Sequence, residues 1–240
     1  MQAIFKELDY QNTPFGEISL RKRSEPRLNH KIIYEVKLGD EFLMSSLFVE
    51  AEEQMSTLSL ALLRHNNFDS EFNIIVGGLG LGYTALAALQ NESVSRLRVI
   101  DVMQPVINWH QQGILPIGDV LATDQRCELI HANFFEMATT DSIGFADDEP
   151  VHAVLLDIDH SPSHWLNESN SDFYSQVSLQ IMANKILPNG VFALWSNDSP
   201  DTDFIHHLET VFSSVEAHVV SFDNPYSGGQ SSNSVYLAVV

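Results

Sequence analysis

Residues 73–90, NIIVGGLGLGYTALAALQ, decide the fold of this chain. An apolar run of β-forming residues leads into a cluster of glycines and then into a segment rich in Ala and Leu. This order predicts a buried strand, a tight turn and the first turns of a helix. Gly78, Gly80 and Gly82 permit positive φ angles and let a ligand approach the main chain. The free N–H groups at the helix start favour a nucleotide-like ligand.

Strand and helix patterns alternate after this stretch. Further core strands are predicted at residues 96–102, 127–131, 151–157 and 191–195. Helices are predicted at residues 104–111 and 172–186, and one opens at Ser199-Pro200, with Ser199 as its N-cap. Repeated β-α units predict a parallel, Rossmann-like sheet whose ligands bind beyond the carboxyl ends of the strands. The last apolar runs predict an antiparallel C-terminal strand pair, joined by a mobile loop at residues 223–234.

The N-terminal part has a different periodicity. Residues 15–46 contain three short alternating runs bounded by Gly and Asp, which is typical of antiparallel strands and hairpins. Residues 49–65 follow with apolar side chains at helical spacing. We therefore predict a small N-terminal β domain over residues 1–48 and an α/β domain over residues 49–240.

The composition limits the partners. The 240 residues include 12 Lys and Arg against 32 Asp and Glu, a net charge of −20 that repels nucleic acid and anionic membranes. A cationic small molecule fits this charge, although acidic side chains also simply keep a protein in solution. Cys127 is the only cysteine, which excludes an internal disulfide. With no long apolar run, the chain is expected to be cytoplasmic.

Polar residues at the ends of the first three core strands suggest a cofactor site. Asp101 ends the second strand, where a carboxylate can accept hydrogen bonds from ribose hydroxyls. Asn133 follows the third strand and could contact an adenine amino group. The Gly78-x-Gly80-x-Gly82 spacing is common in S-adenosylmethionine-binding proteins, whereas Gly80-x-Gly82-x-x-Ala85 satisfies the dinucleotide pattern. Both kinds of cofactor remain open.

The fourth strand ends in a group of titratable residues, Asp157, Asp159 and His160. A carboxylate there could orient an amine nucleophile or take its proton. Trp165 in the following loop, and Tyr174, are candidate substrate-binding residues. His160 and a second histidine four residues later lie beside two Asp, but on a predicted loop instead of one helix face, so no metal is expected.

Several segments resemble the spermidine synthase (polyamine aminopropyltransferase) family in order and spacing: EQMSTLSL, IIVGGLGLG, the acid ending the second strand, LLDIDHSP and FYSQVSLQIMANKILPNGVFALWS. The resemblance implies a small β domain followed by a methyltransferase-type sheet, and often a homodimer. It also implies that Gly78, Gly80, Gly82 and Asp101 hold S-adenosylmethionine or its decarboxylated form. Asn133 would then contact the adenine, and Asp157 would lie where the transferred group leaves the sulfur.

The sequence departs from that family at three acids. Gly80 stands where the family motif GGGDGG has Asp, and the family's second fourth-strand Asp falls on His160 unless Asp159 takes its place. The family's Tyr-x-Glu before the first core strand is absent; the nearest residues are Glu53 and Gln54, which leaves Gln54 as a candidate substrate-binding residue.

These departures suggest a changed acceptor. We expect an S-adenosylmethionine-dependent transferase that acts on a small molecule, with methyl transfer narrowly favoured because Gly80 replaces an acid. Aminopropyl transfer from decarboxylated S-adenosylmethionine is the near alternative. An NAD-dependent oxidoreductase and a non-catalytic cofactor-binding module are further alternatives.

Overall fold

The small sheet is formed by the N-terminal part of the chain. The structure is a computed structural model that describes residues 3–69, 71–142, 144–145, 147 and 149–240. The sheet is antiparallel in the order β1-β2-β3-β4. Its strands are β1 (Phe5–Thr13), β2 (Gly16–Glu25), β3 (Lys31–Leu38) and β4 (Glu41–Ser45). The alternating runs predicted the last three. They did not predict β1, an edge strand that pairs only with β2 and buries no side chain fully.

The main sheet has the order β10-β11-β9-β8-β5-β6-β7. Its strands are β5 (Phe72–Gly77), β6 (Val94–Asp101), β7 (Cys127–His131), β8 (Val151–Leu156), β9 (Ile186–Ser196), β10 (Ser214–Asn224) and β11 (Gly229–Val239). Strands β5 to β9 run parallel, and β10 and β11 are antiparallel to their neighbours. This arrangement confirms the predicted Rossmann-like methyltransferase-type sheet with an antiparallel C-terminal pair.

Helices cover both faces of the main sheet. The side chains of a strand point alternately to its two faces, and in this sheet both sets are apolar. Ile74 and Val76 pack in one core cluster with buried residues of the first helices, while Ile75 packs in a second cluster with residues of the later helices. The helices are α1 (Glu50–His65), α2 (Tyr83–Leu89), α3 (Gln104–Gln111), α4 (Gly118–Thr123), α5 (Phe134–Thr139), α6 (Gln176–Ala183) and α7 (Thr202–Leu208), with 3-10 turns at Pro26–Leu28 and Glu168–Tyr174. No helix in the described part of the chain has the length and apolar character to cross a membrane.

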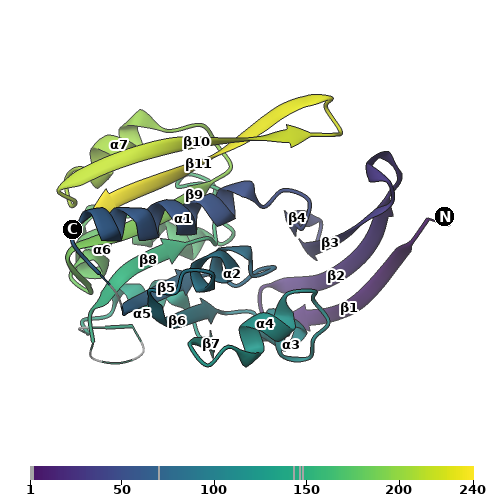
Figure 1. The fold of residues 1–240 in the computed structure, drawn as a ribbon, viewed down its shortest axis with the longest axis horizontal. Coiled ribbons are helices and arrows are strands. Elements are labelled where there is room, and N and C mark those ends of the chain that lie inside the picture. Colours follow the sequence, from purple (N-terminus) through teal and green to yellow (C-terminus); the bar gives the residue numbers. More distant parts are fainter. Residues whose placement is uncertain (1–2, 70, 143, 146, 148) are drawn as a thin grey trace.

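The two sheets are joined through one core. Ile18, Leu20 and Val36 of the small sheet belong to the same buried cluster as Ile74 and Val76 of the main sheet. In Figure 1 the small sheet lies at one end of the molecule, and the hairpin β10–β11 reaches toward it from the main sheet. This arrangement places the small sheet beside the carboxyl ends of the parallel strands.

The prediction of a mobile loop at residues 223–234 is wrong. β10 and β11 pair continuously from Ser214 with Val239 to Asn224 with Gly229, so most of that segment is strand. The tip of the hairpin is held by the small sheet, because the Tyr226 hydroxyl donates to Glu25 Oε2 at 2.9 Å. Polar, Gly-rich composition indicated a loop, but the pairing of two long strands overrides that local preference.

Two helix boundaries also differ from the prediction. α7 begins at Thr202 and is capped by the side chain of Asp201, which accepts from two main-chain N–H groups, so the predicted N-cap at Ser199 is wrong. The helix predicted at residues 172–186 is shorter, because Ser175 caps α6 and β9 already begins at Ile186. The Pro-Asn-Gly segment therefore lies inside a strand.

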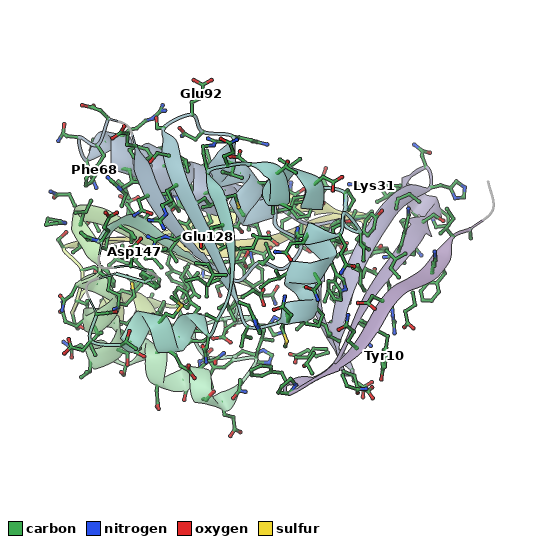
Figure 2. The ribbon with its side chains drawn as sticks, turned by 90° about the horizontal axis from the view of Figure 1, so that it is seen from below. Tyr10, Lys31, Phe68, Glu92, Glu128 and Asp147 are labelled. Carbon is green, nitrogen blue, oxygen red and sulfur yellow. The ribbon has the colours of Figure 1, made fainter. Side chains whose placement is uncertain are left out.

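The charge is divided unequally between the two parts of the chain. Residues 1–48 carry seven of the twelve Lys and Arg and an equal number of acids, so the net charge of −20 belongs to residues 49–240. Figure 2 shows Lys31 on the small sheet at one end of the molecule, and Glu128 and Asp147 toward the other. The main domain therefore attracts cations over distances of about a Debye length, roughly 10 Å.

Candidate functional site

The glycine loop between β5 and α2 has a backbone that other residues would not adopt without strain. Gly78, Gly80 and Gly82 have φ angles of 94°, 47° and 88°. A Cβ atom on Gly78 would overlap the main-chain carbonyl oxygen of Asp157. Glycine is needed at residue 78 because the loop after β5 and the chain leaving β8 touch through their main chains.

Asp101 at the end of β6 fastens this loop. Its Oδ2 accepts from the Leu79 N–H at 2.9 Å and its Oδ1 from the Met103 N–H at 2.7 Å. Burial raises the pKa of Asp101, while these main-chain hydrogen bonds lower it. On the other side of the loop, Nε2 of the buried His110 lies 2.9 Å from the Gly80 carbonyl oxygen. The loop is thus held from two neighbouring elements.

Two adjacent cavities lie at the carboxyl edge of the sheet. The first, called the apolar cavity, has a volume of about 150 Å³ and is lined mainly by apolar side chains together with Gly78, Gly80, Asp101 and Asn133. The second, called the acidic cavity, has a volume of about 350 Å³ and is lined by Glu52, Asp157, aromatic side chains and two asparagines. Both are lined by Leu43, Met44, Gly80, Asp157, Ile158 and Leu166. The two cavities therefore adjoin at Asp157.

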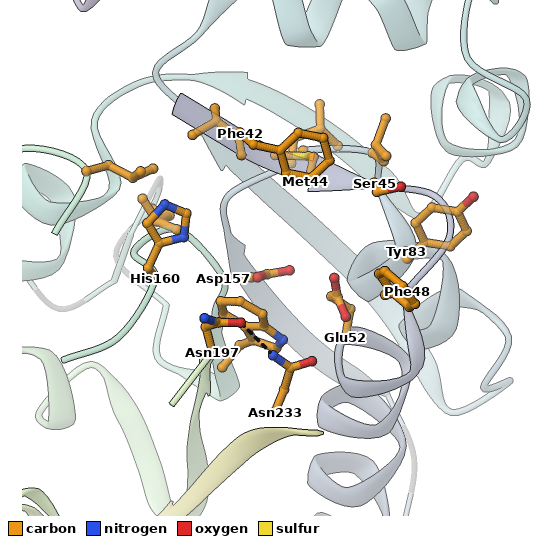
Figure 3. Close-up of a pocket in the computed structure, with 18 of the residues that line it drawn as sticks. Phe42, Met44, Ser45, Phe48, Glu52, Tyr83, Asp157, His160, Asn197 and Asn233 are labelled. Atoms are coloured by element: carbon orange, nitrogen blue, oxygen red, sulfur yellow. Dashed lines mark hydrogen bonds between the residues drawn. The ribbon is translucent and has the colours of Figure 1, made fainter. Parts of the chain in front are cut away.

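Two carboxylates meet in the acidic cavity. Glu52 comes from the first turn of α1 and Asp157 directly follows β8, and Figure 3 shows their carboxyl groups close together. Thr84 Oγ1 donates to Asp157 Oδ2 at 2.7 Å. No Lys or Arg is among the described residues that line either cavity. The negative charge of this pair is therefore left for a cationic ligand to neutralise.

Without a Lys or Arg beside them, both carboxyl groups have raised pKa values. Burial, followed by repulsion from Asp157, raises the pKa of Glu52 to about 8. Burial raises the pKa of Asp157 to about 6, against the opposing hydrogen bond from Thr84. Because the two groups interact, they titrate as a pair. A bound cation would lower the pKa of both groups.

Glu52→Gln is expected to stabilise the protein at alkaline pH. The pKa of Glu52 is higher in the folded chain than its ordinary value of 4.5. The folded state binds the Glu52 proton more tightly than the unfolded state does. This contribution to stability is fully present below about pH 4.5 and is lost as the pH rises toward about 8, where Glu52 ionises in the folded protein. Replacing the carboxyl with an amide should raise the free energy of unfolding by about 2 kcal/mol near pH 9, with no gain near pH 4.

Urea denaturation of wild type and Glu52→Gln at both pH values measures this difference. Glu53→Gln is the matched control, because Glu53 is an exposed acid on the same helix and lines neither cavity. Equal stability of Glu52→Gln and wild type near pH 9 would contradict the raised pKa.

The other acids near β8 have different surroundings. Asp159 is buried and accepts hydrogen bonds from the Leu166 N–H, Asn170 Nδ2 and the Tyr174 hydroxyl, at 2.8, 2.8 and 2.9 Å. It lines neither cavity and organises its own loop instead. His160 does line the acidic cavity, where its Nε2 lies 2.9 Å from Glu41 Oε1 of β4.

The three predicted substrate-binding residues are not brought into either cavity. Gln54 is exposed on α1. Trp165 is exposed, and its indole N–H donates to the Pro162 carbonyl at 2.8 Å. Tyr174 is buried, with its hydroxyl on Asp159. The described residues contain no group of three or more His, Cys, Asp or Glu side chains that could hold a metal ion.

Asn133 lines the apolar cavity and also shapes it. Its side chain caps α5 by accepting from the Phe135 N–H at 3.0 Å. Phe134 and Phe135 line the same cavity, and Phe134 is buried against the core. The third strand end thus contributes an amide and two aromatic rings, a set that suits a flat heterocyclic ring.

Several lining residues of the acidic cavity were not predicted. Glu52 carried a usable signal, since with Ser56, Leu60 and Leu63 it follows the helical spacing of the buried face of α1. Trp195 and Asn197 end β9, so the strand-end rule could have found them. Phe222 and Asn233 carried no such signal, because the predicted strand pair was joined by a loop, and only the continuous hairpin brings both residues to the cavity.

Comparison with known proteins gives structural matches only. No family model matches the sequence, and no curated protein does. Spermidine synthase from Thermotoga maritima matches with a TM-score of 0.72 and 16% identity, over 98% of this chain and 72% of that one. A spermidine synthase in complex with the transition-state analogue AdoDATO matches with a TM-score of 0.71, 16% identity and the same coverage.

A methyltransferase is also similar. Human methyltransferase-like protein 13 in complex with SAH matches with a TM-score of 0.62 and 18% identity, over 79% of this chain and 81% of that one. Identities this low establish the fold alone. The spermidine synthases match nearly the whole chain, including the small N-terminal sheet. The protein therefore has the spermidine synthase-like fold, in which a small β domain precedes a methyltransferase-type sheet.

Proposed function

We propose that this protein transfers an aminopropyl group from decarboxylated S-adenosylmethionine to a small amine. The observation that carries the proposal is the Glu52–Asp157 pair in a cavity where no described lining residue is Lys or Arg. Two partly buried carboxylates without a counter-ion are stabilised by ammonium groups. The aromatic side chains around them add favourable contacts for a cation.

The apolar cavity fits an adenosyl group. Gly78, Asn133 and Phe135 line the space for a ring. Asp101 accepts two main-chain hydrogen bonds, which leaves lone pairs on its oxygens for ribose hydroxyls. The similar structures of the AdoDATO and SAH complexes support a ligand of this type. When bound, a sulfonium donor supplies an activated alkyl carbon whose bonding electrons return to sulfur as a neutral thioether leaves.

The choice of aminopropyl over methyl transfer rests on charge. S-adenosylmethionine carries a carboxylate at the end of its methionine chain, and the Glu52–Asp157 pair would repel it. The decarboxylated donor carries only an ammonium there, which the pair would attract. Gly80 favoured methyl transfer in the sequence because an acid is missing from the glycine loop. Glu52 supplies an acid to the same cavity from α1, which reverses that preference.

The two acids could also accept the proton that the acceptor amine must lose. An amine is nucleophilic only when its nitrogen has lost a proton. Asp157, with its pKa raised to about 6 and its position fixed by Thr84, can accept that proton near neutral pH. Glu52 holds the charge that remains on neighbouring ammonium groups. Most of the rate would come from placing the nitrogen in line with the reacting carbon.

A donor competition tests this function. The purified protein is incubated with a mixture of amines and either donor, and the released nucleoside is identified by mass spectrometry. Methylthioadenosine from the decarboxylated donor should form about 10-fold faster than S-adenosylhomocysteine from S-adenosylmethionine, a difference of about 1.4 kcal/mol. Glu52→Gln is the companion variant and should narrow this ratio.

The opposite ratio would establish methyl transfer, the second candidate that Gly80 favours. Calorimetric titration separates the remaining alternatives. Binding of NAD alone would indicate an oxidoreductase, and binding of a donor without any product would indicate a cofactor-binding module.

A further inference from the structure

The acidic cavity has fewer acids than a diamine would need. Glu52 and Asp157 are its only acids among the described lining residues. The proposed donor brings one ammonium group, and the reacting nitrogen of the acceptor brings a second. One carboxylate is then available for each. A further ammonium on the acceptor would enter the cavity without a partner, which is costly when a charge leaves water.

Apart from His160, which lies 2.9 Å from Glu41 Oε1, the rest of the described cavity wall has no Asp, Glu, Lys or Arg. Five aromatic side chains line it, namely Phe42, Phe48, Tyr83, Trp195 and Phe222. Figure 3 shows Phe42 above the acids, Phe48 and Tyr83 to one side of Glu52, and Asn197 with Asn233 below the acids. This wall suits the apolar body of a ligand better than a second cation surrounded by its hydration shell. The volume of about 350 Å³ also exceeds that of the apolar cavity, about 150 Å³.

The wall of the acidic cavity also contains hydrogen-bond donors. The Trp195 indole nitrogen is buried and has no partner among the described residues. Asn197 Oδ1 accepts a hydrogen bond from Asn233 Nδ2 at 3.1 Å. The Asn197 side-chain N–H groups take no part in this bond. The indole nitrogen has almost no accessible surface, so the N–H groups of the exposed Asn197 side chain are the donors that a ligand oxygen can reach.

We propose that the acceptor is a monoamine with an apolar body and an oxygen atom that accepts hydrogen bonds, and that diamines are discriminated against. This inference rests on the proposed function, since the count of charges includes the donor's ammonium group. Glu52 and Asp157 select the amine, the aromatic residues contact the apolar body, and the Asn197 side chain selects the oxygen.

Three amines of similar length test the proposal: 4-aminobutan-1-ol, n-pentylamine and 1,4-diaminobutane. Their binding is measured by calorimetry on the protein saturated with decarboxylated S-adenosylhomocysteine, which carries the donor's ammonium group but cannot transfer it. The aminoalcohol should bind roughly 10-fold more tightly than the diamine, with the alkylamine between them. A diamine that binds as tightly as the aminoalcohol, or no binding of any amine, would overturn the proposal.

Transfer assays with the same amines distinguish this failure from that of the proposed function. If the aminoalcohol binds best but receives no aminopropyl group, the proposed function fails and the ligand class stands. If the diamine is both bound and alkylated best, the function stands and this inference fails.

Asn197→Asp adds the missing carboxylate. Its Oδ1 can still accept from Asn233 Nδ2, so the local hydrogen bond is kept. The variant should shift the ratio of diamine to aminoalcohol affinity roughly 10-fold toward the diamine. Asn184→Asp is the matched control, because this exposed asparagine of the α6 C-cap also accepts from a side-chain amide, that of Gln180, and lines neither cavity. An equal shift in both variants would show an effect of net charge and overturn the assignment.

Discussion

Replacing Asp157 with Asn is expected to lower kcat/KM for amine alkylation by about 1,000-fold, within the range of a lost general base. Asp157 lines both cavities, so its carboxyl group would lie between the proposed donor and acceptor. An amide has the same shape but neither accepts a proton nor balances the charge of an ammonium group. Steady-state rates with the decarboxylated donor and the best amine measure the effect.

The substitution should leave the fold intact. Thr84 Oγ1 can donate to the amide oxygen as it does to Asp157 Oδ2. Removing a carboxyl whose pKa is raised by burial also removes a cost of ionisation, so the variant should be at least as stable as wild type near pH 8. The adenosyl ligand should still bind, because Asp101 and the glycine loop are unchanged.

Asp198→Asn is the control for this experiment. Asp198 follows β9 at the same edge of the sheet, but it is exposed and lines neither cavity. Its replacement should change kcat/KM by less than about 2-fold, as is usual for surface changes. If Asp157→Asn kept more than a tenth of the activity, the proton would have to leave through another group, and Glu52 would be the first to examine.

Gly78→Ala should abolish detectable binding of the adenosyl donor, weakening it by about 100-fold or more, which is about 2.7 kcal/mol. The added methyl group would overlap the Asp157 carbonyl oxygen, and the φ angle of 94° already disfavours alanine. Relief of the overlap requires the glycine loop and the end of β8 to move apart. That movement shifts Asp157 and the loop amides together. Calorimetric titration with the donor measures the loss.

Gly228→Ala separates the overlap from the backbone strain. Gly228 has a φ angle of 71°, and a Cβ atom there would meet nothing within 4 Å. This control should lose only about 1 kcal/mol of stability and bind the donor normally. Equal loss of donor binding in both variants would mean that the close approach of Gly78 to Asp157 is not what shapes the site.

The sequence determined the parts of this protein that depend on local pattern. The run from residue 73 to 90 predicted the strand, the turn and the helix, because glycine spacing and apolar periodicity act over a few residues. The rule that ligands bind at the carboxyl ends of parallel strands then pointed to Asp101, Asn133 and Asp157. The structure places all three along the cavities, because β6, β7 and β8 end at the same edge of the sheet.

Only the tertiary structure decided which acids of the site lie free for a ligand. Asp157 and Asp159 are two residues apart, yet one lines both cavities and the other is buried under hydrogen bonds from Leu166, Asn170 and Tyr174. Glu52 joins Asp157 from a helix more than a hundred residues earlier in the chain. Contacts between residues so far apart in the sequence depend on how helix, sheet and hairpin pack. That packing is determined by which side chains are buried together across the whole chain, and a short stretch of sequence does not specify it.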